Sequence, residues 1–197
     1  MAAGQRFVGT LRPPWRWFQC GGEKRGRGIG YSGHKHQRGE KVVNIADNAG
    51  HILSPLVVAA VNVHDSILLP DSVDRLAHLT QRLGIDLYGS FVTFDPGFDS
   101  AANKQRINAA GLIPVIKPNF RNTKDKNIIA ERNELFAELK PLYRLRYRIE
   151  RCYAWEDTYR KLVIRYERLP QTFLGWRYLA SAMINFRECF GKNGGKR

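Results

Sequence analysis

The sequence lacks any apolar run that could cross a membrane. Its most apolar stretch, residues 52–63, is interrupted by proline, serine and asparagine, whereas a membrane-spanning helix needs roughly 20 predominantly apolar residues. The first residues also lack the apolar core of a signal peptide. We therefore expect a cytoplasmic protein that has no membrane as its partner.

Cysteine is also scarce. The three cysteines, Cys20, Cys152 and Cys189, lie far apart in the sequence and form no Cys-x-x-Cys pair. Such spacing indicates neither a disulfide framework nor a zinc ribbon. We interpret all three as small apolar residues in a reducing compartment.

Acidic residues are outnumbered by basic ones. The 197-residue chain has 18 Asp and Glu against 32 Lys and Arg, which gives a formal net charge of +14 at pH 7. A balance this basic indicates a polyanionic partner, with nucleic acid as the first candidate and an acidic membrane surface as the second. The 43% of hydrophobic residues still suffices for the core of one domain of ordinary size.

Basic side chains gather in two stretches, residues 25–41 and 117–126. Either stretch could neutralise phosphates without reading base edges. Solvation alone would explain any single residue among them, but the net charge requires several to cluster. The residues of these stretches that we predict to contact DNA are Lys35, Arg38, Lys117 and Arg121.

The beginning of the chain differs in composition from the rest. Residues before about 40 are crowded with Pro, Gly, Arg and Lys and show no sustained apolar period, so we expect little regular structure there. We divide the chain into an irregular basic segment over residues 1–29, a folded domain over 30–191 and a basic tail over 192–197.

From residue 41 the pattern predicts strands and helices in alternation, followed by helices alone. Two β-rich runs separated by turn residues predict an antiparallel hairpin over 41–60. A strand, a helix and a second strand over 90–118 predict a parallel crossover. The predicted helices cover residues 67–84, 100–111, 128–140, 141–167 and 171–190, with Pro141 and Pro170 in first-turn positions. This order predicts an α/β fold with a mixed sheet, flanking helices and a helical C-terminal part.

Asp95 ends the predicted buried strand over residues 90–95. The carboxyl ends of strands are where α/β proteins gather ligands and catalytic groups, so this carboxylate could face a ligand. The sequence Asp95-Pro96-Gly97 is equally typical of a turn that leaves a strand. This stretch alone leaves the two interpretations even. Asp99 suits the N-cap of the helix that follows.

The predicted helix over residues 141–167 carries an apolar stripe at helical spacing. Tyr143, Arg146 and Glu150 are spaced three and four residues apart, which places them together on a neighbouring face. Taken alone, that face is better explained as solvated surface with a helical Arg–Glu pair than as a functional site.

Together, these stretches resemble the DDE transposases of bacterial insertion sequences, a branch of the RNase H-like superfamily. Residues 30–42 (GYSGHKHQRGEKV) resemble the segment after that family's first catalytic strand, and residues 62–66 (NVHDS) resemble its lead into the first helix. Residues 94–100 (FDPGFDS) are similar to the motif around the second catalytic aspartate. The resemblance runs from about residue 30 to residue 190.

The remaining part of the resemblance is a Tyr-x-x-Arg-x-x-x-Glu signature, formed here by Tyr143, Arg146 and Glu150. It implies an RNase H-like (integrase-like) fold, with Asp95 and Glu150 as the second and third catalytic residues and as metal ligands. Tyr143 and Arg146 would contact DNA. The family signature also has a lysine seven residues after its glutamate; this chain has Asp157 there, with Lys161 one turn later as the candidate DNA contact.

The first catalytic aspartate of the family has no counterpart at its expected place. It should lie on a strand before residue 30, yet no aspartate precedes Asp47. Residues 7–10 (FVGT) resemble a decayed form of that strand, with Val8 where the aspartate is expected. Asp47 is a poor substitute, because its surroundings are typical of a tight hairpin turn. We therefore expect the first strand to be missing or degraded and the chain to be truncated at its N-terminus.

The resemblance implies metal-dependent DNA strand cleavage and strand transfer at the ends of an insertion sequence. A site of this type holds two Mg²⁺ or Mn²⁺ ions between its carboxylates, and without one carboxylate we expect metal binding to be weak or absent. The chain alone should then be inactive. An alternative is a catalytically inert DNA-binding module derived from a transposase. A third interpretation is a basic protein with an unrelated α/β fold.

Double-stranded DNA, as transposon ends and target, is the partner that the resemblance implies. Such a protein would be prokaryotic and associated with the nucleoid when bound to DNA. Protein partners would be a second copy of the chain, in a homodimer, or an intact transposase.

Overall fold

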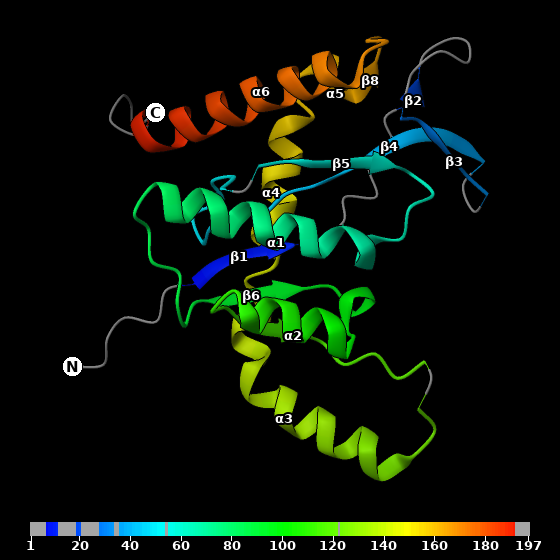
Figure 1. Cartoon of the computed structure of the whole chain (residues 1–197), viewed down its shortest axis with the longest axis vertical. Coiled ribbons are helices and arrows are strands. Elements are labelled where there is room, and N and C mark those ends of the chain that lie inside the picture. The colour runs from blue at the N-terminus through cyan, green and yellow to red at the C-terminus, as the bar shows by residue number, and fades with distance from the viewer. Residues whose placement is uncertain are drawn as a thin grey trace, which may run out of the picture.

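The computed structural model describes residues 7–11, 19–20, 28–33, 36–53, 55–121 and 123–191. Strands form in its first third and helices predominate in its last third (Figure 1). The strands are β1 (Phe7–Leu11), β2 (Gln19–Cys20), β3 (Gly30–Ser32), β4 (Gln37–Val43), β5 (Val57–Ala60), β6 (Phe91–Phe94), β7 (Ile113–Ile116) and β8 (Ile164–Arg165). The helices are α1 (Asp65–Arg82), the 3-10 helix η1 (Pro96–Phe98), α2 (Ala101–Ala109), α3 (Lys126–Arg144), α4 (Tyr147–Glu156), α5 (Arg160–Val163) and α6 (Pro170–Phe190).

Strands β1, β6 and β7 form a parallel sheet with β6 in the centre. Leu11 is paired with Phe94, and Phe94 with Ile116, so the three strands end at the same level. Helix α2 connects β6 to β7, and the predicted parallel crossover is confirmed. The three strand ends therefore present their following loops along one edge, where α/β proteins build sites.

Strands β3, β4 and β5 form a separate antiparallel sheet. Glu40 is paired with Ala60 and Val43 with Val57, which confirms the hairpin predicted over residues 41–60. The chain reverses at residues 47–50, where Gly50 has a φ of 92°, a conformation that a residue with a side chain rarely adopts. The mixed α/β class is confirmed, although the parallel and antiparallel pairings lie in different sheets.

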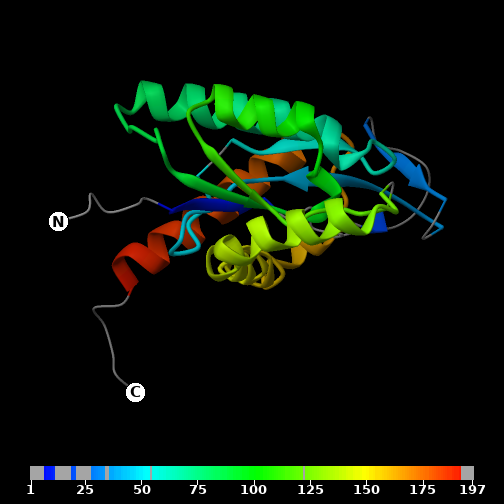
Figure 2. The same ribbon diagram turned by 90° about the horizontal axis from the view of Figure 1, so that it is seen from below.

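The strands lie between two layers of helices, with α1 and α2 on one side and α3, α4 and α6 on the other (Figure 2). Helix α1 buries Leu69, Val73 and Leu76 in the core on its own side of the sheets. On the opposite side, Ile149 of α4 and Phe173 of α6 belong to a second buried cluster. Among the described residues, every helix falls short of a bilayer span in length or in apolar character.

The prediction of little regular structure before about residue 40 is wrong. Strands β1 and β2 form within residues 1–29, and β3 and most of β4 form before residue 41, where little regular structure was expected. Pairing with β6 and with β8, both distant in the sequence, supplies the backbone hydrogen bonds of β1 and β2. Of the two expected possibilities for the first strand, it is therefore not missing, and its sequence FVGTL contains no carboxylate.

The single helix predicted over residues 141–167 is also wrong. Helix α3 continues through Pro141 to Arg144, and α4 starts afresh at Tyr147. None of the described residues of α3 is buried, whereas α4 buries Ile149, Cys152 and Tyr153. The packing of α4 into the core therefore decides where the helix breaks. The apolar period along the sequence cannot show which part of a predicted helix packs against another element. Pro170 does occupy the first turn of α6.

One buried ion pair joins β8 to β4 of the antiparallel sheet, and a second joins α6 to α4. Arg165 contacts Glu40, and both side chains are about 1% exposed; Arg177 donates to Glu156 at 2.9 Å. Burial raises the pKa of Glu40, and burial lowers the pKa of Arg177. The guanidinium groups of Arg165 and Arg177 lie 5.4 and 5.1 Å from the ring centre of Phe173. Each cation therefore has a carboxylate and an aromatic face as partners.

Candidate active-site cleft

A cleft of about 590 Å³ opens at the edge where β6 and β7 end. Its walls come from three chain segments: the start of α1, the loop after β6 and the loop after β7. The residues that line it are His64, Asp65, Asp95, Pro96, Gly97, Phe98, Lys117, Pro118, Asn119, Phe120 and Arg121. The cleft therefore contains Asp95 and two of the residues predicted to contact DNA, Lys117 and Arg121.

Asp95 takes part in the turn through its backbone rather than through its carboxylate. Its carbonyl accepts a hydrogen bond from the N–H of Phe98 at 2.9 Å, and its side chain makes no capping hydrogen bond to η1. The carboxylate is instead ion-paired with Arg146. The turn interpretation of Asp95 therefore holds for its backbone, whereas the ligand-facing interpretation of its carboxylate stays a prediction.

Arg146 reaches Asp95 from the break between α3 and α4. Its side chain is 20% exposed and that of Asp95 16% exposed, so the pair is mostly shielded from water. The guanidinium also lies 5.1 Å from the ring centre of Tyr143 in the last turn of α3, a distance typical of a cation–π contact. Tyr143 and Arg146 do come together, but Tyr143 lies in α3 and Arg146 in the break that follows it, rather than on one helical face.

Glu150 lies one turn further along α4 and is exposed. It is not among the residues that line the cleft. Helix α4 packs against β1, and Figure 1 shows α4 crossing from the parallel sheet towards α6. The close approach of Glu150 to Asp95 that a shared site requires stays a prediction.

The sequence did not indicate that Asp65 lines the cleft, and it assigned another role to Asp99, which lies next to the lining residue Phe98. Asp65, the first residue of α1, accepts a hydrogen bond from Lys41 Nζ at 2.6 Å. Asp99 was predicted to cap α2, but Ser100 does so by accepting from the N–H of Asn103. Asp99 instead accepts from the N–H of Asn119 at 2.7 Å, which ties the loop after β7 to the loop after β6. No sequence signal indicated these contacts, because the paired residues are distant along the chain.

The remaining predicted DNA contacts lie elsewhere. Lys161 of α5 lies over the ring of Trp176, with Nζ 4.3 Å from the ring centre. Arg38 is exposed on β4 and is paired with Tyr31 of β3. Lys35 lies outside the described residues. The structure therefore gathers Lys117, Arg121 and Arg146 around Asp95 and leaves Arg38 and Lys161 outside the cleft lining.

Asp47 and Val8, the two positions considered for the first aspartate, do not supply it at the cleft. The carboxylate of Asp47 accepts from the N–H groups of Ala49 and His51 at 2.8 Å each, which confirms its role in the hairpin turn. Val8 lies in an irregular part of the pairing between β1 and β6, three residues before Leu11. At about 3.3 Å per residue, that is roughly 10 Å along the strand from the level of Phe94.

A comparison with known protein families identifies the class of protein to which the chain belongs. The family model described as "Transposase DDE domain" matches residues 10–185, which is most of the chain. The chain belongs to this family of transposases. The match begins within β1, earlier than the resemblance read from the sequence.

A search of curated proteins finds no match. Among solved structures, the chain is similar to one described as "Mos1 transposase paired-end complex with left transposon end", with 12% identity and a TM-score of 0.39. The alignment covers 76% of this chain and 55% of that one, so this chain spans just over half the length of that protein. The family assignment rests on the family model and not on this structural likeness.

The DDE transposase family generally uses divalent metal ions. Within the part of the chain that the structure describes, no group of three or more His, Cys, Asp or Glu side chains could hold a metal ion. The Asp95 carboxylate is engaged by the Arg146 guanidinium, and Asp65 is paired with Lys41. These residues do not fit a two-metal site, which needs several carboxylates around each pair of ions.

Proposed function

We propose that this chain is a DNA-binding transposase domain that does not cut or join DNA strands on its own. Membership of the transposase family supports a role in DNA transposition and recombination. In an intact member, metal-dependent cleavage and strand transfer at insertion-sequence ends would be the reaction, and Asp95 and Glu150 would be the two catalytic carboxylates retained here.

The observation that carries the proposal is the ion pair between the Asp95 carboxylate and Arg146. The negative charge of Asp95 is neutralised by Arg146, and the adjacent strand β1 contains no carboxylate that could join it. A carboxylate held by a guanidinium is a poor metal ligand, because the ion would have to displace a charge-assisted hydrogen bond. The incomplete carboxylate set therefore supports the loss of strand-transfer activity.

The charges around the cleft favour binding of a polyanion. The negative charges of Asp65 and Asp95 are each matched by a cation, Lys41 and Arg146. Lys117 and Arg121 then leave the lining with an excess of positive charge. Two cations beside a mostly neutral cleft suit contact with DNA phosphates, which gives affinity without sequence readout.

Two measurements on the same preparation test the two halves of the proposal. Fluorescence anisotropy with a labelled duplex should show binding that weakens steeply as salt rises. A gel assay with labelled transposon-end DNA in Mg²⁺ or Mn²⁺ should show no cleavage by the chain or by its Glu150→Gln variant, whereas an intact transposase of the family cleaves in parallel. Absence of binding at low salt would refute the DNA-binding half. Cleavage that Glu150→Gln abolishes would refute the inactivity.

A further inference from the structure

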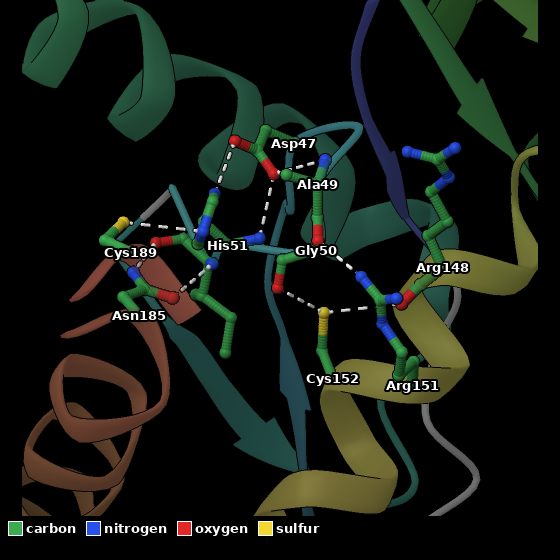
Figure 3. A network of polar contacts seen from close by, with 10 residues as sticks. Asp47, Ala49, Gly50, His51, Arg148, Arg151, Cys152, Asn185 and Cys189 are labelled. Atoms are coloured by element: carbon green, nitrogen blue, oxygen red, sulfur yellow. Dashed lines mark hydrogen bonds and ion pairs between the residues drawn. The ribbon is translucent and has the colours of Figure 1, made fainter. Parts of the chain in front are cut away.

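Away from the cleft, three side chains form a line of polar contacts on the surface (Figure 3). His51 Nδ1 lies 2.9 Å from Asp47 Oδ2, and His51 Nε2 lies 3.5 Å from the Sγ atom of Cys189. Asp47 and His51 belong to the turn that follows β4, whereas Cys189 lies in the last turn of α6. Cys189, His51 and Asp47 thus lie in the spatial order of nucleophile, base and orienting carboxylate. This arrangement activates a thiol or hydroxyl in covalent catalysis.

The surrounding contacts hold this arrangement in place. Asn185 Oδ1 accepts from the N–H of Ile52 at 3.0 Å, and Asn185 Nδ2 donates to the Ile52 carbonyl at 2.9 Å. Asn185 therefore fixes the chain next to His51 against α6. Cys189 follows Asn185 by four residues and so lies on the same face of that helix. One face of α6 therefore provides both the Asn185 hydrogen bonds to Ile52 and the Cys189 thiol next to His51.

The proton positions follow from the donors and acceptors. The ionised carboxylate of Asp47 can only accept hydrogen bonds, so the neutral imidazole of His51 carries its proton on Nδ1. Its Nε2 lone pair then faces Cys189 and can accept the thiol proton. In addition, Asp47 is fixed by the N–H groups of Ala49 and His51, which fixes the orientation of the ring.

This geometry is unsuited to a metal ion. The two ring nitrogens of His51 point in opposite directions, towards Asp47 on one side and Cys189 on the other. One ion cannot contact three ligands that lie in a line through the ring.

We propose that Cys189 is a nucleophilic thiol that reacts with small disulfides, with His51 as its base and Asp47 as the residue that orients the imidazole. The Cys189 thiol transfers its proton to His51 Nε2, and the thiolate attacks one sulfur of the disulfide. A new bond joins Cys189 Sγ to that sulfur while the original disulfide bond breaks. The released thiolate takes the proton from His51, so the disulfide is the oxidant and one of its thiols is the reduced product.

Cys152 provides a matched comparison within the same molecule. It is buried and its thiol contacts the Gly50 carbonyl at 2.9 Å, in the same turn that carries His51. Burial raises the pKa of the Cys152 thiol to about 12. Cys189 is exposed and has an imidazole as its neighbour. Two cysteines that contact one turn therefore differ in access and in the presence of a base.

The test is the rate of reaction with dithiobis(nitrobenzoate) at neutral pH, measured in a Cys20→Ser background and assigned to each cysteine by peptide mass mapping. Cys189 should react at least about tenfold faster than the same cysteine in a free peptide of residues 183–191, since a positioned base contributes at least this much. Cys152 should remain unmodified while the protein is folded. Equal rates for the folded protein and the peptide would overturn the proposal without any further variant.

Two substitutions test the roles of the partners. His51→Gln removes the base, and Asp47→Asn preserves the turn acceptor but favours the tautomer whose Nε2 carries a proton. Each should lower the Cys189 rate about tenfold, and added imidazole should restore it in His51→Gln. The control His78→Gln, at an exposed histidine of α1, should leave the rate unchanged. Rates within twofold of the parent in both variants, with an unchanged circular dichroism spectrum, would show that His51 and Asp47 do not activate the thiol.

Discussion

Arg146, in the break between α3 and α4, is ion-paired with Asp95 at the end of β6. The contact joins the C-terminal helices to the edge of the parallel sheet, and it engages the carboxylate that we propose as a catalytic group in an intact family member. Tyr143 supports the same guanidinium from the last turn of α3. Three residues that the sequence analysis assigned to two separate stretches thus form one structural unit.

The energetic link between these two residues can be measured with a double-mutant cycle. We expect Asp95→Asn and Arg146→Gln each to lower the free energy of unfolding, and the double variant to lose less than their sum. The coupling energy should be about 1–3 kcal/mol, because both side chains are mostly shielded from water. Urea unfolding at neutral pH gives the four values. Strict additivity would show that the two groups do not interact in solution.

The buried pair Glu156–Arg177 should be far more sensitive than an exposed pair. Glu156→Gln leaves the Arg177 cation in the core with a weaker partner, so we expect a loss of about 3–5 kcal/mol in the free energy of unfolding. The matched control is Asp71→Asn, which removes one partner of the exposed pair Asp71–Arg75 and should change stability by less than about 1 kcal/mol. Losses of equal size would contradict the burial of the Glu156–Arg177 pair.

Cys152 should make the fold sensitive to alkaline pH. Burial raises the pKa of its thiol from 9.0 to about 12, so between these values the folded chain keeps a proton that the unfolded chain loses. The stability supplied by this proton is complete below pH 9.0 and is lost as the pH rises through about 12. Denaturant unfolding over this range should show a steeper decline for the parent than for Cys152→Ala. Parallel curves for the two proteins would exclude this contribution.

Lys117 and Arg121 should contribute to DNA affinity through phosphate contacts. Replacing either one by Gln should weaken duplex binding for all sequences alike and reduce the slope of log Kd against log salt by about one. Arg82→Gln is the control, because Arg82 ends α1 at the opposite end from the cleft residue Asp65, about 25 Å away along the helix. If the control lowers the slope as much as the cleft variants do, the affinity comes from net charge rather than from the cleft.

The sequence by itself determined those features that depend on neighbours along the chain. The β-rich runs around the turn at Asp47 form the hairpin, the helical spacing after Asp65 forms α1, and residues 90–118 form the crossover of β6, α2 and β7. Asp95 was placed at a strand end by the apolar run that precedes it. Turn chemistry and apolar period act over a few residues, so they can be read without knowing the fold.

Tertiary structure decided the contacts between distant segments. Strands β1 and β2 form because β6 and β8 offer them backbone partners, although composition alone predicted little regular structure in this part of the chain. The helix break before Tyr147 follows from burial of α4, and the pairing of Asp95 with Arg146 follows from that break. Cys189 likewise meets His51 only because α6 packs on the hairpin turn. Such contacts depend on how whole elements pack against one another, and no local pattern encodes which distant side chain will lie opposite.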